Sequence, residues 1–554
     1  MSETAVEVEA RSDGYQVVYQ GKRLYTDANP RAAADRRAAA ATIPPRHLIM
    51  VPSPLLWYGI DRLMARDDAP EAVLCVELDR NLAAFSAHNF PPALRDDPRL
   101  TFLTGDDQAT LDAALTSIGV DTFSGCDIIT LSGGFALNSR RYRALETHLR
   151  SVLRANWQNR LSLIRLGRRW LLNVFNNLAE LPNSRSLDES TADRPTVLVG
   201  AGQSLEHCLD ALQRFRSEVR IVAVDTALGS LYAAGIQPDY VIVLESQLIN
   251  REHLLGFMRH GTTFVFDISS APQIVRQVEP QFRCFFASRF TECAFLRRLE
   301  RSGLPATWIP PRGSVAVAGL ETLSNRIGRP LYLLGTDFSF QTGKPHARGT
   351  GSHRWYLRHC SRLHPDSLYA QAMQRPLVTL SDKNGAKARS DTILAGYRLQ
   401  LLDVLSRIAG PAYDLSPGGL SIELPRAACD ALGEHAFAGQ SPVSGARAQP
   451  LAPPPTRTPP APASSMVREF LEAQLTMEHA LLSDAIGDLE QLYREGSLDP
   501  VVIRRVLSSC DYLEIDFPAR VKPAEASASN VHQLLVSARH FARVLQNVLT
   551  RLAG

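Results

Sequence analysis

The feature that most limits the possible fold is a strand, glycine and helix series in residues 194–247. A short β-branched run at residues 196–199 leads into Gly200 and Gly202, and a helical pattern follows Ser204. A strand that stops at glycines just before a helix favours a parallel α/β unit, in which the positive end of the helix faces a crevice. The pattern predicts a nucleotide site. It also fits a tight turn with Ser204 as a helix cap.

Two further strand patterns end in acidic residues. Residues 219–224 lead into Asp225, and residues 240–244 lead into Glu245. Asp225 lies roughly 20 residues after the glycine loop, as a ribose-contacting carboxylate does in dinucleotide-type units. Because parallel strands end at the same edge of a sheet, Gly202, Asp225 and Glu245 are predicted to share that edge.

A second group of ligand-type residues occurs between residues 312 and 349. A glycine and a serine precede a helical pattern, and the strand at residues 330–334 leads into a polar loop with a lysine and a histidine. Loops after parallel strands are the usual place of α/β sites. The residues singled out are Gly313, Ser314, Gly335, Thr336, Asp337, Lys344 and His346.

The order of these motifs resembles a known family. The series GAGQSL, VAVDTAL, AGIQPDYVIVLES, RGSVAVAGLETL and YLLGTDFSFQTGKPHARGT is similar to the domain shared by bacterial motility accessory factors and archaeal 6-hydroxymethylpterin diphosphokinases. It covers residues 190–425, and the ordered set is more specific than any single motif. Residues 24–30 also resemble the N-terminal signature of the motility accessory factors, which is not expected in the smaller archaeal kinases.

The resemblance implies a sialyltransferase-like, Rossmann-like central domain and a glycosyltransferase activity. Motility accessory factors are regarded as enzymes that transfer a nonulosonic acid, such as pseudaminic or legionaminic acid, from a CMP-activated donor to flagellin. A donor of this type needs no metal in principle, since its leaving group carries a single phosphate. The expected partners are therefore the CMP-sugar and flagellin, and no cofactor is required.

The resemblance also suggests roles for the residues. His346 is the expected base, and Asp337 would orient it or serve instead. The glycine loop and Ser204 would hold the donor phosphate, Asp225 and Glu245 the ribose or cytosine, and the start of the second helix the sugar carboxylate or the phosphate. The full donor-binding set is Gly200, Gly202, Ser204, Asp225, Thr226, Asp239, Glu245, Gly313, Ser314, Gly335, Thr336 and Lys344.

Two alternatives remain open from the sequence. A pyrophosphokinase acting on 6-hydroxymethylpterin would need Mg²⁺ to neutralise ATP, and the candidate ligands would be Asp225, Asp239, Glu245 and Asp337. A non-catalytic module that binds flagellin is the other. Length and the N-terminal signature weigh against the kinase.

The 554 residues predict several domains. We expect an N-terminal α/β domain with bridging helices at residues 1–185, a central catalytic domain at 186–440, a Pro/Ala-rich linker at 441–465 and a helical domain at 466–554. The N-terminal strand candidates are residues 48–51, 72–76, 100–103 and 127–131. The loop after the first of these lacks the glycines of a phosphate site, which favours a scaffold or acceptor-docking role.

Composition excludes several other classes. There are 60 basic and 57 acidic side chains, so no long-range field attracts nucleic acid or an anionic membrane. No apolar run reaches 18 residues and the N-terminus lacks the apolar core of a signal peptide, so a cytoplasmic protein is expected. The 8 cysteines form no CxxC pair and are expected to be reduced.

Overall fold

The computed structural model describes most of the chain and divides it into two compact units. The described residues are 5–25, 28–119, 123–187, 194–258, 261–291, 293–304, 307–340, 344–363, 375–434, 463–516 and 527–554. The units are Met1–Ser162 and Leu163–Gly554. The division falls inside helix α6 (Ser139–Leu178), whereas the predicted N-terminal domain ends at residue 185. The central sheet and the C-terminal helices belong to the same second unit. Residues 441–462 of the predicted linker lie outside the described residues.

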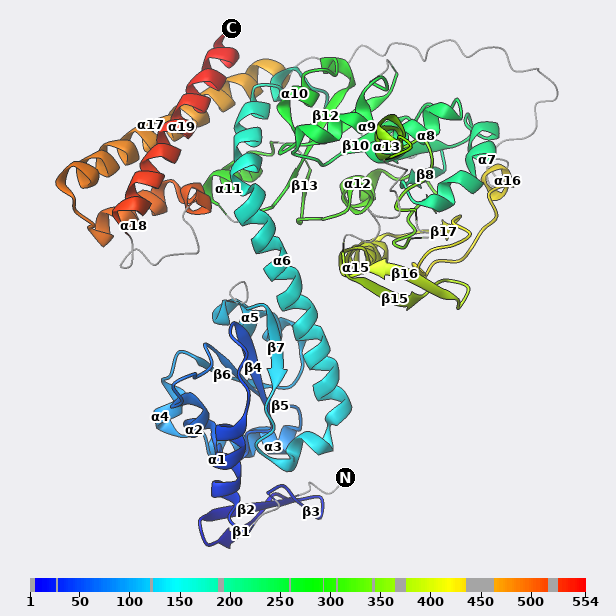
Figure 1. The fold of residues 1–554 in the computed structure, drawn as a ribbon. Coiled ribbons are helices and arrows are strands. Elements are labelled where there is room, and N and C mark those ends of the chain that lie inside the picture. The colour runs from blue at the N-terminus through cyan, green and yellow to red at the C-terminus, as the bar shows by residue number, and fades with distance from the viewer. Residues whose placement is uncertain are drawn as a thin grey trace. The chain divides into compact units, whose positions relative to one another are not determined.

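The first unit contains a parallel sheet of four strands in the order β6-β5-β4-β7 (Figure 1). The four predicted strands are all present. A small antiparallel sheet, β1-β2-β3, precedes them and was not predicted. The elements are β1 Glu7–Arg11, β2 Gly14–Tyr19, β3 Lys22–Arg23, α1 Pro30–Ala40, β4 His47–Pro52, α2 Ile60–Met64, β5 Val73–Glu77, α3 Arg80–His88, α4 Pro92–Arg95, β6 Leu100–Thr104, α5 Gln108–Ile118 and β7 Gly125–Ile128.

The carboxylate at the end of β5 is internally satisfied. Glu77 is buried and accepts hydrogen bonds from the hydroxyls of Ser53, at 2.6 Å, and Tyr142, at 3.2 Å. The backbone N–H of Asp79 donates a third bond at 3.0 Å. A carboxylate with three internal donors has little capacity left for a ligand. The scaffold or acceptor-docking role of the first unit stays a prediction.

The second unit is built on a parallel sheet of eight strands in the order β13-β12-β11-β10-β9-β8-β14-β17. The predicted α/β class is confirmed. The elements are β8 Thr196–Val199, α7 Leu209–Arg214, β9 Arg220–Val224, α8 Leu228–Ala233, β10 Tyr240–Val243, α9 Arg251–Leu254, β11 Thr263–Asp267, α10 Pro272–Val275, β12 Arg283–Ser288, α11 Ala294–Arg301, β13 Trp308–Ile309, α12 Val315–Leu323, β14 Leu331–Leu334, α13 Gly351–His359, β15 Leu377–Ser381, β16 Lys387–Asp391, α15 Thr392–Arg407, β17 Ala412–Asp414 and α16 Ala431–Glu434.

The strand order reverses at β8. Successive strands from β8 to β13 extend the sheet on one side, whereas β14 and β17 add to the other. Ligands of open α/β sheets bind beyond the carboxyl ends of the strands at such a reversal. The topology therefore places the expected site at the ends of β8 and β14.

Two helices, α12 and α15, complete the walls around this edge. Gly319 lets α12 approach β10, because a Cβ atom there would stand 2.8 Å from the side chain of Ile242. Asp391 caps α15 by accepting the backbone N–H groups of Ile393 and Leu394 at 2.8 and 2.7 Å. Such a cap satisfies amides that have no partner inside the helix.

The C-terminal helices pack into one core with the end of α6 and with α11. They are α17 Ala463–Glu495, α18 Pro500–Ser509 and α19 Ala528–Ala553, drawn in orange to red in Figure 1. The shared core includes Phe175, Phe295, Leu482, Ile503 and Phe541. The apolar stripes predicted from the sequence are thus largely core. In the described part of the chain, no helix combines the length and apolarity needed to cross a bilayer.

A buried ion pair joins α11 to α17. Glu478 is fully buried and pairs with Arg298. We expect Arg298→Ala to lower the free energy of unfolding by about 2 kcal/mol, since it leaves a buried carboxylate without its cation. Urea unfolding of the full chain measures this. Arg301→Ala, which removes an exposed arginine of the same helix, should change it by less than about 0.5 kcal/mol. Equal effects of the two substitutions would contradict the assignment.

The expectation that all cysteines are reduced is wrong for one pair. Cys208 and Cys429 form a disulfide, with their Cα atoms 5.6 Å apart. Local spacing could not indicate this bond, because 221 positions separate the two residues. The fold brings them together by packing the segment before α16 against the start of α7.

Candidate active site

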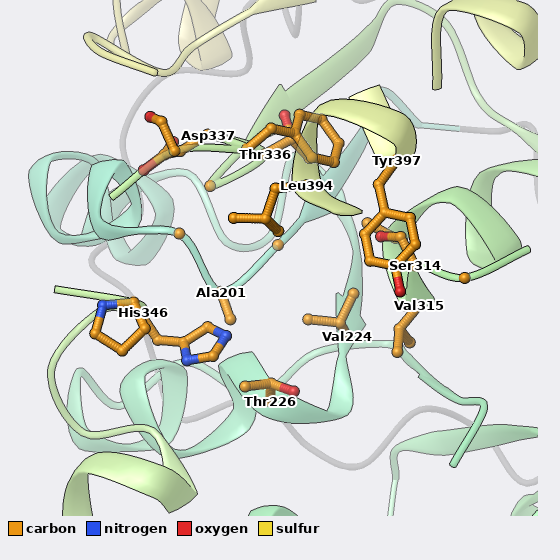
Figure 2. Close-up of a pocket in the computed structure, with 18 residues that line it drawn as sticks. Ala201, Val224, Thr226, Ser314, Val315, Thr336, Asp337, His346, Leu394 and Tyr397 are labelled. Atoms are coloured by element: carbon orange, nitrogen blue, oxygen red, sulfur yellow. The ribbon is translucent and has the colours of Figure 1, made fainter. Parts of the chain in front are cut away.

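A cavity of about 230 Å³ lies at the carboxyl edge of the large sheet, at the strand reversal. Its walls come from the ends of β8, β9 and β14, the start of α12, the loop that holds His346, and α15 (Figure 2). The lining residues that the sequence predicted are Gly200, Gly202, Thr226, Gly313, Ser314, Gly335, Thr336, Asp337 and His346.

The glycines after β8 and β14 make room for each other. A Cβ atom on Gly200 would stand 2.4 Å from the carbonyl oxygen of Gly335, and one on Gly202 would stand 2.7 Å from the carboxylate of Asp337. The N–H groups of Gly200 and Gly202 donate to the carbonyls of Leu334 and Gly335, both at 2.8 Å. These amides already have acceptors, which favours the tight-turn interpretation of the loop over a phosphate cradle.

Asp337 holds this junction together. One carboxylate oxygen accepts the backbone N–H of Ser204 at 2.9 Å, and the other accepts the Ser204 hydroxyl. Burial raises the pKa of Asp337, while the bonds from Ser204 and the nearby Lys383 ammonium oppose the rise. Among the described contacts of Asp337 there is none with His346, so its observed role is to fix the loop after β8.

The start of α12 offers amides to the cavity. Gly313 and Ser314 line it together with Val315 and Ala316 of the first turn. The Ser314 side chain makes no capping bond. First-turn amides have no acceptor within their own helix, and the helix dipole places partial positive charge there. This end of the cavity therefore suits an anion.

Three buried polar atoms that line the cavity lack a partner. They are Thr336 Oγ1, Ser339 Oγ and His346 Nδ1. An unsatisfied buried group costs about 1–3 kcal/mol, so a fold retains several around one cavity where a ligand or water completes them. Figure 2 shows His346 on the opposite side of the cavity from Ser314 and Tyr397. Burial, with a small contribution from His253, lowers the pKa of His346 to about 4, so its imidazole is neutral at pH 7.

Two carboxylates stand close together at the ends of β9 and β10. Burial raises the pKa of Asp225 to about 6, although Thr226 donates to it. Burial and the charge of Asp225 raise the pKa of Glu245 to about 7, against a bond from Asn250. Asp225 Oδ2 is buried without a partner. The pair carries less than its full negative charge near neutral pH, so it repels an anionic ligand nearby less strongly than two ionised carboxylates would.

The pKa of Glu245 predicts a pH-dependent effect on stability. Because the folded state holds this proton up to about pH 7 and the unfolded state releases it near its ordinary pKa of 4.5, wild-type stability falls across that window. In Glu245→Gln this loss is absent. The melting temperature of the variant minus that of the wild type should therefore become more positive from pH 4.5 to 7.5. Exposed Glu469→Gln is the control and should give a constant difference; a flat difference for Glu245→Gln would count against the raised pKa.

Comparison with known proteins agrees with this geometry. Residues 171–343 match the family model described as 6-hydroxymethylpterin diphosphokinase MptE-like. The matched residues lie in the second unit. The match includes β8 to β14 and ends just before Lys344 and His346, so the family description does not extend to the predicted base.

The whole chain has the fold of a solved glycosyltransferase. The structure of MAf glycosyltransferase from Magnetospirillum magneticum AMB-1 is similar over 100% of this chain and 91% of that chain, with a TM-score of 0.52 and 15% identity. Together with the family-model match over residues 171–343, this similarity confirms the resemblance inferred from the motifs. At this identity the likeness concerns the fold.

Two curated relatives are uncharacterized proteins of Treponema pallidum (strain Nichols). One is 28% identical over 364 residues, which cover 64% of this chain and 63% of the relative. The other is 25% identical over 123 residues, which cover 21% of this chain and 54% of the relative. The matched part of this chain spans less than two thirds of the length of either.

Five predicted donor-binding residues do not line the cavity: Ser204, Asp225, Asp239, Glu245 and Lys344. Ser204 and the carboxylates of Asp225 and Glu245 are described above. Asp239 precedes β10, so it stands at the amino edge of the eight-stranded sheet, where it accepts the N–H of Ile221 at 2.8 Å and pairs with Arg216 at 3.1 Å. Its inclusion as a donor-binding residue is corrected, because it begins a strand instead of ending one. Lys344 lies 3.8 Å from Glu206 and does not line the cavity.

Other lining residues were missed. Ser339 lies in the loop after β14. The sequence pattern of this loop indicates Asp337 and does not indicate the serine. Leu394 and Tyr397 come from α15, which follows the MptE-like segment and carries no motif. Tyr397 packs against Gly313, where a Cβ atom would stand 2.2 Å from its ring. Only the packing of α15 beside α12 brings this aromatic ring to the site.

Proposed function

We propose that this protein is a glycosyltransferase that moves a nonulosonic acid of the pseudaminic or legionaminic type from a CMP-activated donor to Ser or Thr of flagellin. The observation that carries the proposal is the cavity at the strand reversal, with an anion-compatible helix start on one side and a neutral histidine with a free Nδ1 on the other. The structural neighbour from Magnetospirillum magneticum is named as a glycosyltransferase, which supports the same reaction class.

The donor would bind with its negative groups at the start of α12. The first-turn amides after Gly313 and Ser314 would hold the phosphate or the sugar carboxylate. The hydroxyls of Thr336 and Ser339, which lack partners in the cavity, would complete the polar contacts. Asp225 and Glu245 lie near this edge and, while protonated, would donate to the donor instead of repelling it.

The chemical step needs a proton acceptor. The bond between the anomeric carbon and the phosphate oxygen breaks, and its electron pair leaves with CMP. The acceptor hydroxyl oxygen bonds to the anomeric carbon, and its proton passes to the imidazole of His346. The pKa of His346 is low in the unliganded cavity. A bound anionic donor would raise it, because an adjacent negative charge favours the imidazolium.

The experiment is intact-mass measurement of flagellin co-expressed in the cytoplasm with this protein and a CMP-nonulosonate pathway. The expected result is a ladder of nonulosonate additions that requires both the protein and the pathway. Unmodified flagellin, with the CMP-sugar demonstrated in the same cells, would overturn the proposal. Binding of flagellin without added mass would instead favour a non-catalytic binding module.

One observation favours a second candidate. The description of the matched family names 6-hydroxymethylpterin diphosphokinase, and Asp225 and Glu245 are carboxylates of the kind that hold Mg²⁺ on a triphosphate. Within the described residues, no group of three or more His, Cys, Asp or Glu side chains is arranged to hold a metal ion. Formation of AMP from ATP, dependent on 6-hydroxymethylpterin and Mg²⁺, would establish this activity; its absence alongside sugar transfer would exclude it.

A further inference from the structure

A second cavity of the same unit lies beyond the opposite ends of the helices that bound the first. It has a volume of about 590 Å³, larger than the cavity at the strand reversal. Its walls come from β13, from the turn after α12, from the segment before β14 and from the end of α15. The segment before β14 marks the amino edge of the sheet, so this cavity is distinct from the proposed active site.

Its lining contains buried donors without partners. The indole Nε1 of Trp308, the hydroxyl Oγ1 of Thr322 and the guanidinium Nη1 of Arg329 are buried and unpaired. Thr322 is only 1% exposed. The three groups come from β13, α12 and the segment before β14, and they line one space. Because buried donors are rarely left unsatisfied, their convergence marks a place where an acceptor binds.

The charges of the lining are also unbalanced. Glu321 is its acidic residue, and it is already neutralised by Arg312 at 2.6 Å and by Arg407 at 2.8 Å. Arg407 makes a further pair with Asp403 at 3.0 Å. Arg329 has no carboxylate partner among the described residues, and burial lowers its pKa. The guanidinium is therefore partly desolvated without the counter-charge that usually accompanies such burial.

We propose that this second cavity binds a phosphate-bearing small molecule. The guanidinium of Arg329 would pair with phosphate oxygens, and the Trp308 N–H and Thr322 hydroxyl would donate from the other directions. A tetrahedral oxyanion can accept hydrogen bonds from several directions at once. The volume leaves room for an organic part against Ile309, and against Val404 and Ile408 of the α15 end.

Isothermal titration calorimetry of the full chain with inorganic phosphate tests the proposal. Saturable binding is expected for the wild type. Arg329→Gln, which keeps a polar side chain but removes the charge, should weaken binding at least about tenfold, the loss expected for one charge-assisted contact. Trp308→Phe, which removes the indole N–H but keeps a ring, should weaken it less. Arg504→Gln, which replaces an exposed arginine of α18 far along the chain from the lining, should bind like the wild type.

The outcomes separate the two cavities. Absence of saturable binding by the wild type would overturn the proposal and indicate a water-filled space. Phosphate binding that is unchanged in both Arg329→Gln and Trp308→Phe would place the anion elsewhere, such as the start of α12, and would also overturn it. If Arg329→Gln fails to fold, Trp308→Phe decides the question. Neither result depends on sugar transfer, so failure here leaves the proposed function intact.

Discussion

Replacement of His346 by alanine is expected to reduce the transfer rate by about 10²–10⁴-fold, the range that a general base contributes. The imidazole lines the cavity with an unpaired Nδ1. No other lining residue carries an imidazole, and Asp337, the lining carboxylate, is fully engaged by Ser204. The rate of mass gain by flagellin, measured with saturating CMP-sugar, reports the loss. Donor affinity should stay within about twofold, since the proposed anion contacts are those at the start of α12 and not His346.

The matched control is His359→Ala. His359 is exposed near the end of α13, and its ring contacts the carbonyl of Trp355 at 2.7 Å. This substitution also removes an imidazole, but from outside the cavity, so the transfer rate should not change. A His346→Ala enzyme that transfers sugar at the wild-type rate would eliminate His346 as the base while leaving the glycosyltransferase proposal open.

Replacement of Asp337 by alanine should be the most destabilising substitution at the site. The side chain is 2% exposed and accepts both donors of Ser204, which is itself buried. Its removal leaves a buried N–H and a buried hydroxyl unpaired. We expect a loss of about 3–5 kcal/mol in the free energy of unfolding.

Asp337→Asn separates this structural role from a catalytic one. The amide keeps one acceptor for the Ser204 N–H but cannot accept from the hydroxyl in the same geometry, so a smaller loss of about 1–3 kcal/mol is expected. Asp484→Ala, at an exposed position of α17, should cost less than about 0.5 kcal/mol. Urea unfolding measures all three. A fully stable but inactive Asp337→Ala protein would show that the carboxylate acts in chemistry and not in holding the loop.

The periodic parts of the fold were predictable from local patterns. Each predicted strand of the first unit and each motif-bearing strand of the second is present, because a short apolar run between turn signals has few other ways to bury its side chains. The common sheet edge of Gly202, Asp225 and Glu245 was also predictable, since parallel strands with helical crossovers end at the same edge of the sheet. The small β1-β2-β3 sheet escaped prediction because its strands are short and partly exposed.

The site was only partly predictable, and the residues show why. Asp239 and Asp225 both adjoin strands, but one begins β10 and the other follows β9, so only Asp225 reaches the cavity edge. Gly200 and Gly335 match the pattern of a ligand-binding loop. In the structure each must be glycine because a Cβ atom on either would clash with the backbone of the other. A sequence pattern indicates that glycine is required at a position, but it does not indicate whether a bound phosphate or the close approach of another backbone segment is the reason.

Local patterns in the chain were sufficient to predict the parallel α/β class, the C-terminal helices and most of the loops that line the cavity, because these depend on the period of apolar residues and on the ends of strands. The tertiary structure decided which polar atoms have partners. It assigned Asp337 to Ser204, left His346 Nδ1 unpaired, added Tyr397 to the wall and brought Trp308, Thr322 and Arg329 around a second cavity. Hydrogen bonding and burial depend on distances between residues far apart in the chain, and those distances exist only once the sheet and its helices have packed.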